Sequence, residues 1–230
     1  MTARAEMAGR VYAIGDIHGC DVALDVVLSK LDLSADDTVV TLGDVVDRGP
    51  GTKQAIDRLL QLQTVCNVVF LMGNHEEMML DARGGGSIQK SWLGFGGRET
   101  LTSYGGRFDL VPAAHWEFLE AGLDYWEAGS VIFIHANLEP GVALEQQSAE
   151  WLRWTRFTGF ERPHPSGKLV VCGHSAQHSG LPCVLDGWAC IDTWVYGEGS
   201  LTCLDVATGD FMQAKQDGSF RDGLNLRELA

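Results

Sequence analysis

Apolar segments that predict β-strands end, at five places in this chain, directly before residues that can bind a metal ion. GDIHG follows the first segment at 15–19, GDVVDRG the second at 43–49 and GNHE the third at 73–76. His135 and His174 follow two later segments in the same way. Ligands of an open α/β sheet bind outside the carboxyl ends of its strands. We therefore expect these distant residues to meet at one edge of a sheet, which restricts the chain to folds with parallel strands.

The spacing of apolar residues in the first half predicts strands that alternate with helices. We expect strands at 11–14, 38–42 and 68–72, and helices at 21–31 and 52–62. Short buried strands alternating with helices are typical of βαβ units and of a largely parallel sheet.

The second half predicts antiparallel strands instead. We expect these strands at 131–134, 169–172, 189–191 and 201–206, with a hairpin turn at 207–210.

Two segments differ from this core. Residues 77–125 contain several glycine clusters and large aromatic residues such as Trp92, Phe95, Tyr104 and Trp116, and we predict short helices and loops that form a cap beside the sheet. Residues 214–230 form a polar C-terminal tail that we expect to fray after Gln216. Since 230 residues suit one domain, we expect 10–213, cap included, to be a single domain.

The charge of the chain restricts its partners. With 17 Lys and Arg against 31 Asp and Glu, the net charge is −14, so we expect neither nucleic acid nor a membrane as a partner. No apolar run is long enough for a membrane helix, and Met1–Met7 lacks the apolar stretch of a signal peptide. We therefore expect a cytoplasmic protein, and a monomer. The six cysteines include no C-x-x-C pair and are expected to be reduced and mostly buried.

The side chains in the motifs fit one kind of chemistry. Carboxylates, imidazoles and an amide oxygen form a mixed set of ligands, which suits Mn²⁺, Fe or Zn²⁺ better than Ca²⁺. Two such ions about 3.5–4 Å apart can clamp a phosphate and activate a water molecule. Asp44 stands in the middle of the motif order and is the candidate to bridge the two ions.

Taken together, GDIHG, GDVVDRG, GNHE and the two later histidines resemble the signatures of the phosphoprotein-phosphatase branch of the calcineurin-like metallophosphoesterases. The likeness runs from about Arg10 to about Gln213, nearly the whole chain. It implies an α/β (α+β) fold of two facing mixed β-sheets flanked by helices. It also implies an enzyme, a metal-dependent phosphoesterase.

The resemblance implies two metal ions, Mn²⁺ being our first choice and Fe or Zn²⁺ the alternatives. The residues that would hold them are Asp16, His18 and Asp44 for the first ion, and Asp44, Asn74, His135 and His174 for the second. Asn74 would also contact the substrate.

The resemblance makes His75 the general acid that protonates the leaving oxygen, with Asp47 orienting the ring and raising its basicity. Arg48 would bind the phosphate together with a second arginine, for which Arg156 is our choice and Arg153 the rival. Attack on phosphorus would be direct and in line, by a water that the two ions activate, without a phosphoenzyme.

Three positions depart from the pattern of such phosphatases. Asn137 and Trp194 stand where glycine is usual, and Ser175 stands where threonine is common. None of them removes a metal ligand, so we expect a changed substrate surface and unchanged chemistry.

The resemblance leaves three functions open. The first is a phosphatase for phosphoserine and phosphothreonine in proteins, similar to bacterial serine/threonine protein phosphatases, or for small phosphoesters. The alternative is a symmetrical dinucleoside-tetraphosphate (Ap4A) hydrolase. Such hydrolases typically lack the aspartate equivalent to Asp47 and carry GNHD where this chain has GNHE, which weighs against the alternative. The third is a non-catalytic binding protein on the same fold, but no ligand is missing from the motifs.

Overall fold

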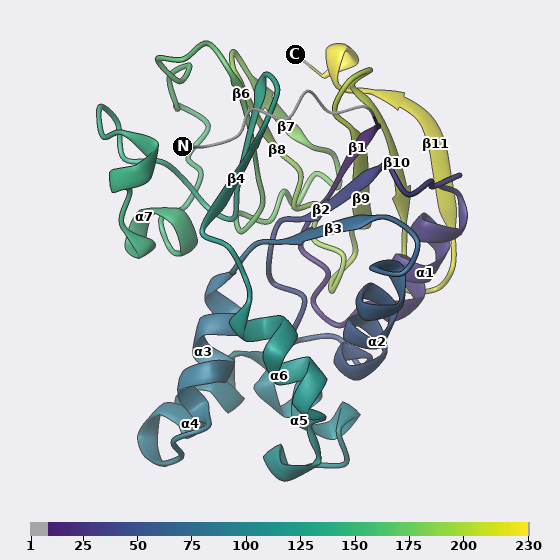
Figure 1. Cartoon of the computed structure of the whole chain (residues 1–230), viewed down its shortest axis with the longest axis vertical. Helices are drawn as coiled ribbons and strands as arrows, with labels where there is room; N and C mark the ends of the chain where they lie inside the picture. Colours follow the sequence, from purple (N-terminus) through teal and green to yellow (C-terminus); the bar gives the residue numbers. More distant parts are fainter. Residues whose placement is uncertain (1–8, 230) are drawn as a thin grey trace.

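The computed structural model describes residues 9–229 of the chain. They form two β-sheets that face each other, with helices beside the sheets and a helical segment beyond one end of them (Figure 1). Met1–Met7, from which the sequence argues against a signal peptide, lies outside the described residues.

The first sheet has six strands in the order β11-β10-β9-β1-β2-β3. Their bounds are β1 Val11–Ile14, β2 Thr38–Thr41, β3 Asn67–Phe70, β9 Leu201–Asp205, β10 Asp210–Ala214 and β11 Phe220–Asn225. β1, β2 and β3 are parallel, as the alternation of strands and helices predicts, whereas β9, β10 and β11 are antiparallel to their neighbours.

The second sheet has five strands in the order β4-β5-β6-β8-β7. Their bounds are β4 Tyr125–Ala128, β5 Val131–Ile134, β6 Leu169–Cys172, β7 Cys183–Leu185 and β8 Trp188–Cys190. The expectation of antiparallel strands is wrong for β5, β6 and β8, which run parallel to one another. Only the hairpins β4–β5 and β7–β8 are antiparallel, because parallel neighbours need the longer connections that follow β5 and β6.

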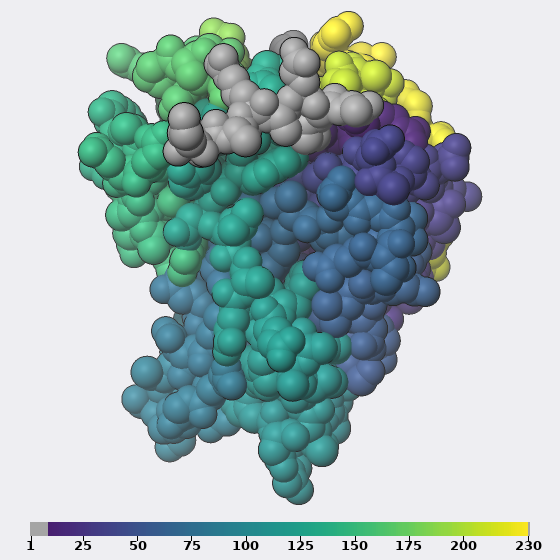
Figure 2. Space-filling model, in the orientation of Figure 1, coloured from purple at the N-terminus to yellow at the C-terminus, as the bar shows by residue number. Residues whose placement is uncertain are grey.

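In the described part of the chain, seven α-helices connect or cover the strands. Their bounds are α1 Asp21–Ser29, α2 Thr52–Leu62, α3 Asn74–Ala82, α4 Gly86–Trp92, α5 Arg98–Ser103, α6 Ala113–Glu120 and α7 Ala149–Arg153. A π-helical turn, η1 (Leu93–Gly97), joins α4 to α5. Helices α4 to α6 protrude beyond the body that the two sheets form (Figure 2).

Alternate residues of each buried strand face different layers, as the period of a β-strand requires. In β1, Val11 and Ala13 belong to the apolar cluster between the two sheets, where Phe133 of β5 also lies. Tyr12 and Ile14 belong to the cluster that the helices α1 and α2 cover. At β1 the first sheet is therefore buried on both faces, which explains why this strand is continuously apolar.

The expectation that the chain frays after Gln216 is wrong, because β11 pairs with β10 at the edge of the first sheet. The turn between them contains Asp217 and Gly218, and Gly218 has a φ of 85°. Asp-Gly between two strands is a strong hairpin signal. The division into a domain at 10–213 and a tail at 214–230 remains a prediction.

Two further expectations concern composition. All six cysteines are free, and all but Cys183 are buried. Within residues 9–229, no helix has both the length and the apolar character that crossing a membrane requires.

Candidate metal centre and active site

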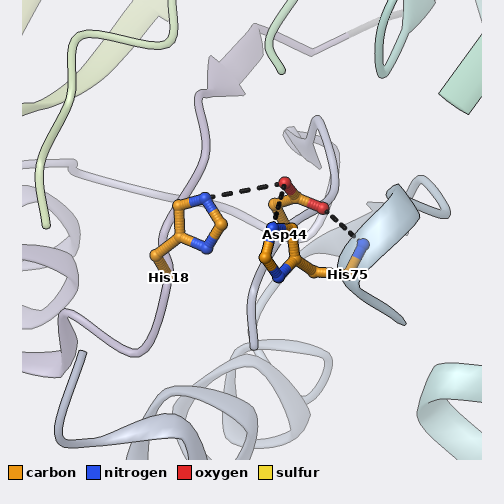
Figure 3. Close-up of side chains that lie close together, drawn as sticks. All are labelled: His18, Asp44 and His75. Atoms are coloured by element: carbon orange, nitrogen blue, oxygen red, sulfur yellow. Dashed lines mark hydrogen bonds and ion pairs between the residues drawn. The ribbon is translucent and has the colours of Figure 1, made fainter. Parts of the chain in front are cut away.

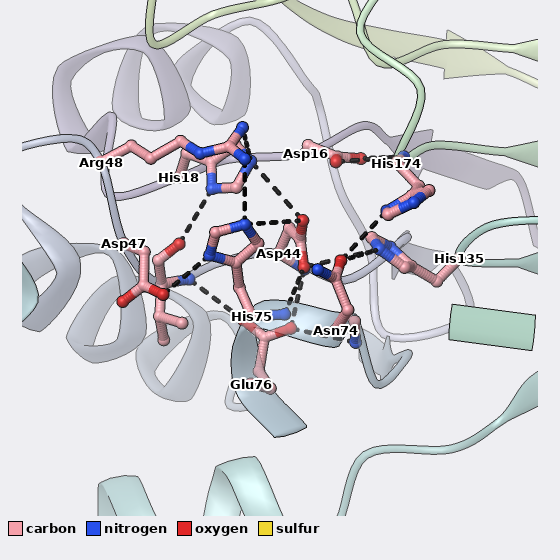
Figure 4. A network of polar contacts seen from close by, with 12 residues as sticks. Asp16, His18, Asp44, Asp47, Arg48, Asn74, His75, Glu76, His135 and His174 are labelled. Carbon is pink, nitrogen blue, oxygen red and sulfur yellow. Dashed lines mark hydrogen bonds and ion pairs between the residues drawn. The ribbon is translucent and has the colours of Figure 1, made fainter. Parts of the chain in front are cut away.

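The loops that follow β1, β2, β3, β5 and β6 meet at one place, where they bring the predicted ligands together (Figure 4). Strands β1 to β3 are parallel in one sheet, and β5 and β6 are parallel in the other. Because parallel strands end at the same edge, residues from across the sequence converge there.

The Asp44 carboxylate lies at the centre of two groups of possible metal ligands. One group is His18, Asp44 and His75, and the other is Asp44, His135 and His174; within each group the ligand atoms lie within 4.8 Å of one another. Asp44 Oδ2 lies 3.5 Å from His18 Nε2, and its Oδ1 lies 3.5 Å from His135 Nε2. One oxygen thus faces each side (Figure 3 shows the first group), as a bridging carboxylate requires.

The histidines of these groups are prepared to bind a metal ion through a lone pair. His18 Nδ1 lies 3.0 Å from the Val46 carbonyl and His135 Nδ1 lies 2.7 Å from the Leu42 carbonyl, so both Nδ1–H groups donate and both Nε2 atoms carry a lone pair. Burial lowers the pKa of His18 and His135, and burial together with His135 lowers the pKa of His174 to about 4. Neutral imidazoles are what a metal ion needs.

Asp16 and Asn74 lie beside the second group. Asn74 Oδ1 is 3.0 Å from His174 Nδ1 and 3.2 Å from His135 Nε2, so its amide oxygen joins those donors. Asp16 belongs to neither group of possible ligands. Both of its carboxylate oxygens, however, lie 3.1 Å from the backbone nitrogen of His174 and accept its N–H.

The electrostatics around Asp16 favour a cation. Burial, then the neighbouring Asp192 and Asp44, raise its pKa well above the ordinary value. A cluster of buried carboxyl groups is relieved by a bound divalent cation, so the residues present fit a metal centre.

The predicted acid, His75, is held by a buried carboxylate. Its Nδ1–H donates to Asp47 Oδ2 at 2.7 Å, and Asp47 is fully buried. Burial disfavours the charged ring, but the charges of Asp44 and Asp47 outweigh it and raise the pKa of His75. Asp47 also accepts hydrogen bonds from Trp92 Nε1 (2.9 Å) and Thr100 Oγ1 (2.8 Å). The sequence analysis missed these two donors, which lie in α4 and α5.

The predicted phosphate-binding arginine, Arg48, points into the centre. Its Nη1 lies 3.2 Å from His18 Nε2 and its Nη2 lies 3.1 Å from His75 Nε2. The guanidinium carbon lies 4.3 Å from the ring centroid of Tyr196, a cation–π distance. Tyr196 was also missed, because no spacing pattern in the sequence links it to GDVVDRG.

The two candidates for the second arginine differ in their contacts. Arg153 donates to Asp124 Oδ1 at 2.5 Å and to Glu77 Oε2 at 3.3 Å, so its charge is already paired. Arg156 lines the cavity at the metal centre, and no described acidic group lies within ion-pair distance of it. The structure therefore favours Arg156 as the residue available to a phosphate.

Backbone strain gathers at this centre. Among residues 9–229 the non-glycine residues with positive φ are His18, Asp44, Asp47, Arg48, His174 and Trp194. Side chains other than glycine rarely adopt this conformation, and such residues cluster where function requires a fixed geometry. Trp194, which stands where the resemblance leads us to expect glycine, has a φ of 62°, a conformation that glycine adopts without strain.

A further residue that the sequence analysis missed, Glu76, holds the loop of Asp44 in place. Its buried carboxylate accepts backbone N–H groups of Asp44 at 2.8 Å, Val45 at 2.7 Å, Val46 at 3.1 Å and Gly73 at 3.0 Å. A glutamate in the third position of a helix is the signal of a capping box, in which it accepts the backbone N–H of the residue before the helix. This signal could have identified the contact of Glu76 with Gly73.

A cavity of 540 Å³, called here the catalytic cavity, opens at the metal centre. One part of its wall consists of site residues, including Asp44, Arg48, His75 and Arg156. The other part is mostly apolar, with Met78, Ile88, Trp92, Phe95 and Trp154 beside Asp81 and Ser91.

The fold and this set of donors define a metal-dependent phosphoesterase. The sequence pattern of the calcineurin-like phosphoesterases matches residues 9–197, and the chain belongs to that family. The two ligand groups around Asp44 agree with the dinuclear centre of divalent ions that the family uses.

Curated relatives carry two kinds of name. The chain is 27% identical to a symmetrical bis(5′-nucleosyl)-tetraphosphatase of Cellvibrio japonicus over 65% of this chain and 55% of that protein. It is 38% identical to serine/threonine-protein phosphatase 2 of Salmonella typhimurium over 34% of each chain. The chain thus spans about half or less of the curated relatives it matches.

A solved structure described as that of a proposed diadenosine tetraphosphatase is similar over almost the whole length. Its TM-score is 0.71 with 18% identity, over 96% of both chains. This likeness supports the fold of two mixed sheets flanked by helices.

Proposed function

We propose that this protein hydrolyses dinucleoside tetraphosphates symmetrically, into two nucleoside diphosphates. The sequence analysis ranked this activity second, behind a protein phosphatase. The names of the relatives support the opposite order, because most of them are named symmetrical tetraphosphatases. This activity is inferred from relatives that the chain matches over part of their length, and from the chain's own metal centre and catalytic cavity.

The observation that carries the proposal is the apolar wall of the catalytic cavity. Ile88 is 53% exposed, Phe95 57% and Trp154 37%, all beside the metal centre. Large apolar side chains are seldom left in solvent beside a polar site unless a ligand covers them. Nucleobases stack on such aromatic rings, and a cavity of several hundred Å³ is the usual size of a small-molecule site.

The metal ions would be held by the predicted ligands Asp16, His18, Asp44, Asn74, His135 and His174, and would supply an activated water and neutralise phosphate charge. The chain's own side chains bind and orient the substrate. Arg48 and Arg156 hold phosphate oxygens through charge-assisted hydrogen bonds. His75 delivers its proton from Nε2 to the leaving oxygen while Asp47 holds Nδ1.

A second candidate is the serine/threonine phosphatase that the sequence predicts. It is favoured because His75 has a full set of supporting contacts as a proton donor. An alkoxide leaving from phosphoserine is a strong base and needs a proton in the transition state. A phosphate leaving from an anhydride is a much weaker base and needs it less. The short contact between His75 and Asp47, supported by Trp92 and Thr100, suits the more demanding reaction.

Direct comparison of substrates tests both candidates. The purified protein would be assayed with Ap4A, a phosphothreonine peptide and p-nitrophenyl phosphate, each with Mn²⁺ and with EDTA, beside His75→Asn. Faster turnover of Ap4A, with release of ADP alone, supports the proposal. Faster turnover of the phosphopeptide makes the protein a phosphatase. Absence of metal-dependent turnover of all three contradicts both candidates.

Several smaller proposals accompany this function. We propose Mn²⁺ as the preferred ion, a monomer as the active form, the cytoplasm as the location, and residues 77–125 as a cap within a single domain at 10–213. Metal content, sedimentation, cell fractionation and deletion of the cap test them in turn.

A further inference from the structure

A second cavity, of 600 Å³, lies on the other side of the segment that carries Arg156. Its walls come mainly from the loops 137–142 and 155–165. The residues that determine its character are Asn137, Trp151, Arg156, Phe160, Glu161 and Trp188. None of the expected metal ligands or proton donors lines it.

Arg156 is common to the walls of both cavities. The segment before it separates them, since Trp154 lines the catalytic cavity while Trp151 and Thr155 line the second one. Arg156 is exposed, and no described carboxylate is close enough for an ion pair with it. An unpaired guanidinium between two cavities, one of them at a metal centre, suits an anion that passes from one cavity to the other.

The second cavity is built around a fixed loop that presents a solvated aromatic ring. Glu161 accepts N–H groups of Thr158 at 2.7 Å and Gly159 at 2.9 Å, and the Asn137 amide at 3.1 Å. These bonds hold the loop, yet the Phe160 ring stays 90% exposed.

A tryptophan completes the wall. Trp188 is 3% exposed, and its indole N–H donates to the Arg162 carbonyl at 2.8 Å, which fixes the ring. With Trp151 and Phe160 it gives the second cavity an aromatic wall, as Phe95 and Trp154 give the catalytic cavity. Both cavities therefore offer a flat apolar group a surface on which to stack.

We propose that the second cavity binds the second nucleoside of a dinucleoside polyphosphate, whose phosphate chain runs along Arg156 and across the metal centre while the first nucleoside occupies the catalytic cavity. This inference rests on the proposed function and explains its symmetry. With a base held on each side, the central phosphates lie at the centre. The oxygen of water bonds to one central phosphorus and gives up one proton to solvent, while the bond from that phosphorus to the central bridging oxygen breaks. That oxygen takes the proton of His75, and solvent then restores the proton of the ring. Two nucleoside diphosphates leave.

Substrates with one base and with two bases test the inference. Wild-type protein with Mn²⁺ would be compared on Ap4A, on adenosine tetraphosphate and on p-nitrophenyl phosphate. The variants are Phe160→Ala, Trp151→Ala and Trp151→Phe, and the control is Val65→Ala, an exposed apolar residue (45%) at the end of α2. We expect the wild type to show a KM for Ap4A at least about tenfold below that for adenosine tetraphosphate, since stacking one more base adds affinity of that order.

In Phe160→Ala and Trp151→Ala, the ratio of the KM for adenosine tetraphosphate to the KM for Ap4A should fall from about ten toward one. The kcat/KM for p-nitrophenyl phosphate should stay unchanged. Trp151→Phe should retain most of the preference, and Val65→Ala all of it. If the wild type prefers Ap4A but both alanine variants keep that preference, the second cavity does not hold the base and the inference is overturned. If the wild type does not cleave Ap4A, the proposed function itself fails, and the inference with it. Loss of phosphopeptide turnover alone in Phe160→Ala would assign the cavity to a peptide and also contradict the inference.

Discussion

The loops at the strand ends and the helices that follow α3 build opposite kinds of surface around one cavity. At the strand ends, His18 and Asp44 are 1% and 2% exposed, and their partners fix them in strained backbone conformations. In the helical segment, Ile88 and Phe95 are more than half exposed at the same cavity. The difference indicates that the loops determine the reaction, whereas the helical segment is free to determine which molecule undergoes it.

The two regions are nevertheless connected at Asp47. Its hydrogen-bond donors Trp92 and Thr100 lie in α4 and α5. In addition, the backbone N–H of Arg48 donates to the Gly96 carbonyl at 3.1 Å, and a Cβ on Gly96 would lie 2.6 Å from that nitrogen. The helical segment thus holds Asp47, the partner of the proposed proton donor His75, and also lines the catalytic cavity, and variants of each region can separate these two contributions.

The largest effect should come from Asp44→Asn. The amide keeps the shape of the carboxylate but removes the charge that both ligand groups share, so kcat on every substrate should fall on the order of 10³-fold or more. Metal content and thermal unfolding with and without Mn²⁺ would be measured alongside. The wild type should be stabilised by Mn²⁺ and the variant should not. A variant that still binds two ions would show that Asp44 does not bridge them.

A smaller effect, dependent on pH, should follow from Asp47→Asn. The raised pKa of His75 keeps the ring protonated to a higher pH than an ordinary histidine, so the acid is present below that pKa and is lost as pH rises through it. Without the Asp47 charge, the alkaline limb of kcat against pH should move down by about one unit.

The same variant distinguishes the two candidate substrates. Turnover of a phosphothreonine peptide should fall about 10²-fold, and turnover of Ap4A much less, because the anhydride needs less help from an acid. Val65→Ala serves as the control for both readouts. An unchanged alkaline limb would show that Asp47 does not act through His75.

A third prediction concerns only the helical segment. Phe95→Ala should raise KM for Ap4A about tenfold through the loss of one stacking surface, and should leave kcat and the turnover of p-nitrophenyl phosphate unchanged. Leu110→Ala, which removes another exposed side chain (51%) of the same segment, is the matched control. A fall in kcat on p-nitrophenyl phosphate would instead show that the helical segment is needed for the chemistry.

The contrast between the regions also explains what the sequence could reveal. The family, the two mixed sheets and the parallel start of the fold were predictable, because GDIHG, GDVVDRG and GNHE follow recognisable strands. The structure then brings His18, Asp44, His135 and His174 together. Such motifs are local, and parallel strands make their meeting point a consequence of topology.

Contacts between distant segments could not be predicted in this way. Trp92 and Thr100 reach Asp47 only because α4 and α5 fold back against the loop of GDVVDRG, and no periodic pattern encodes that return. The parallel pairing of β5, β6 and β8 was missed for a similar reason, since their long connections carry little regular structure. The relatives also favour the alternative substrate over the one that the motifs put first, because the motifs report on the reaction and not on the cavity wall.

The smallest effect should come from Tyr196, which supports the centre through its contacts with Arg48 and His18. Its ring lies beneath the Arg48 guanidinium and meets His18 edge to face at 4.8 Å. Tyr196→Leu should raise both the inhibition constant of inorganic phosphate and the KM for substrate about fivefold. This change corresponds to the loss of about 1 kcal/mol of cation–π attraction.

Tyr196→Phe keeps the ring and should behave as the wild type, so the pair separates the π-face from the hydroxyl group. A purely structural role would predict a lowered melting temperature with an unchanged inhibition constant. If phosphate binding is weakened equally in Tyr196→Leu and Tyr196→Phe, the effect comes from the hydroxyl group. Tyr196 lies in the loop after β8. A change in phosphate affinity without any change in the preference between Ap4A and p-nitrophenyl phosphate would therefore group this residue with the strand-end loops, to which we assign the chemistry. It would set the residue apart from the helical segment, to which we assign the choice of substrate.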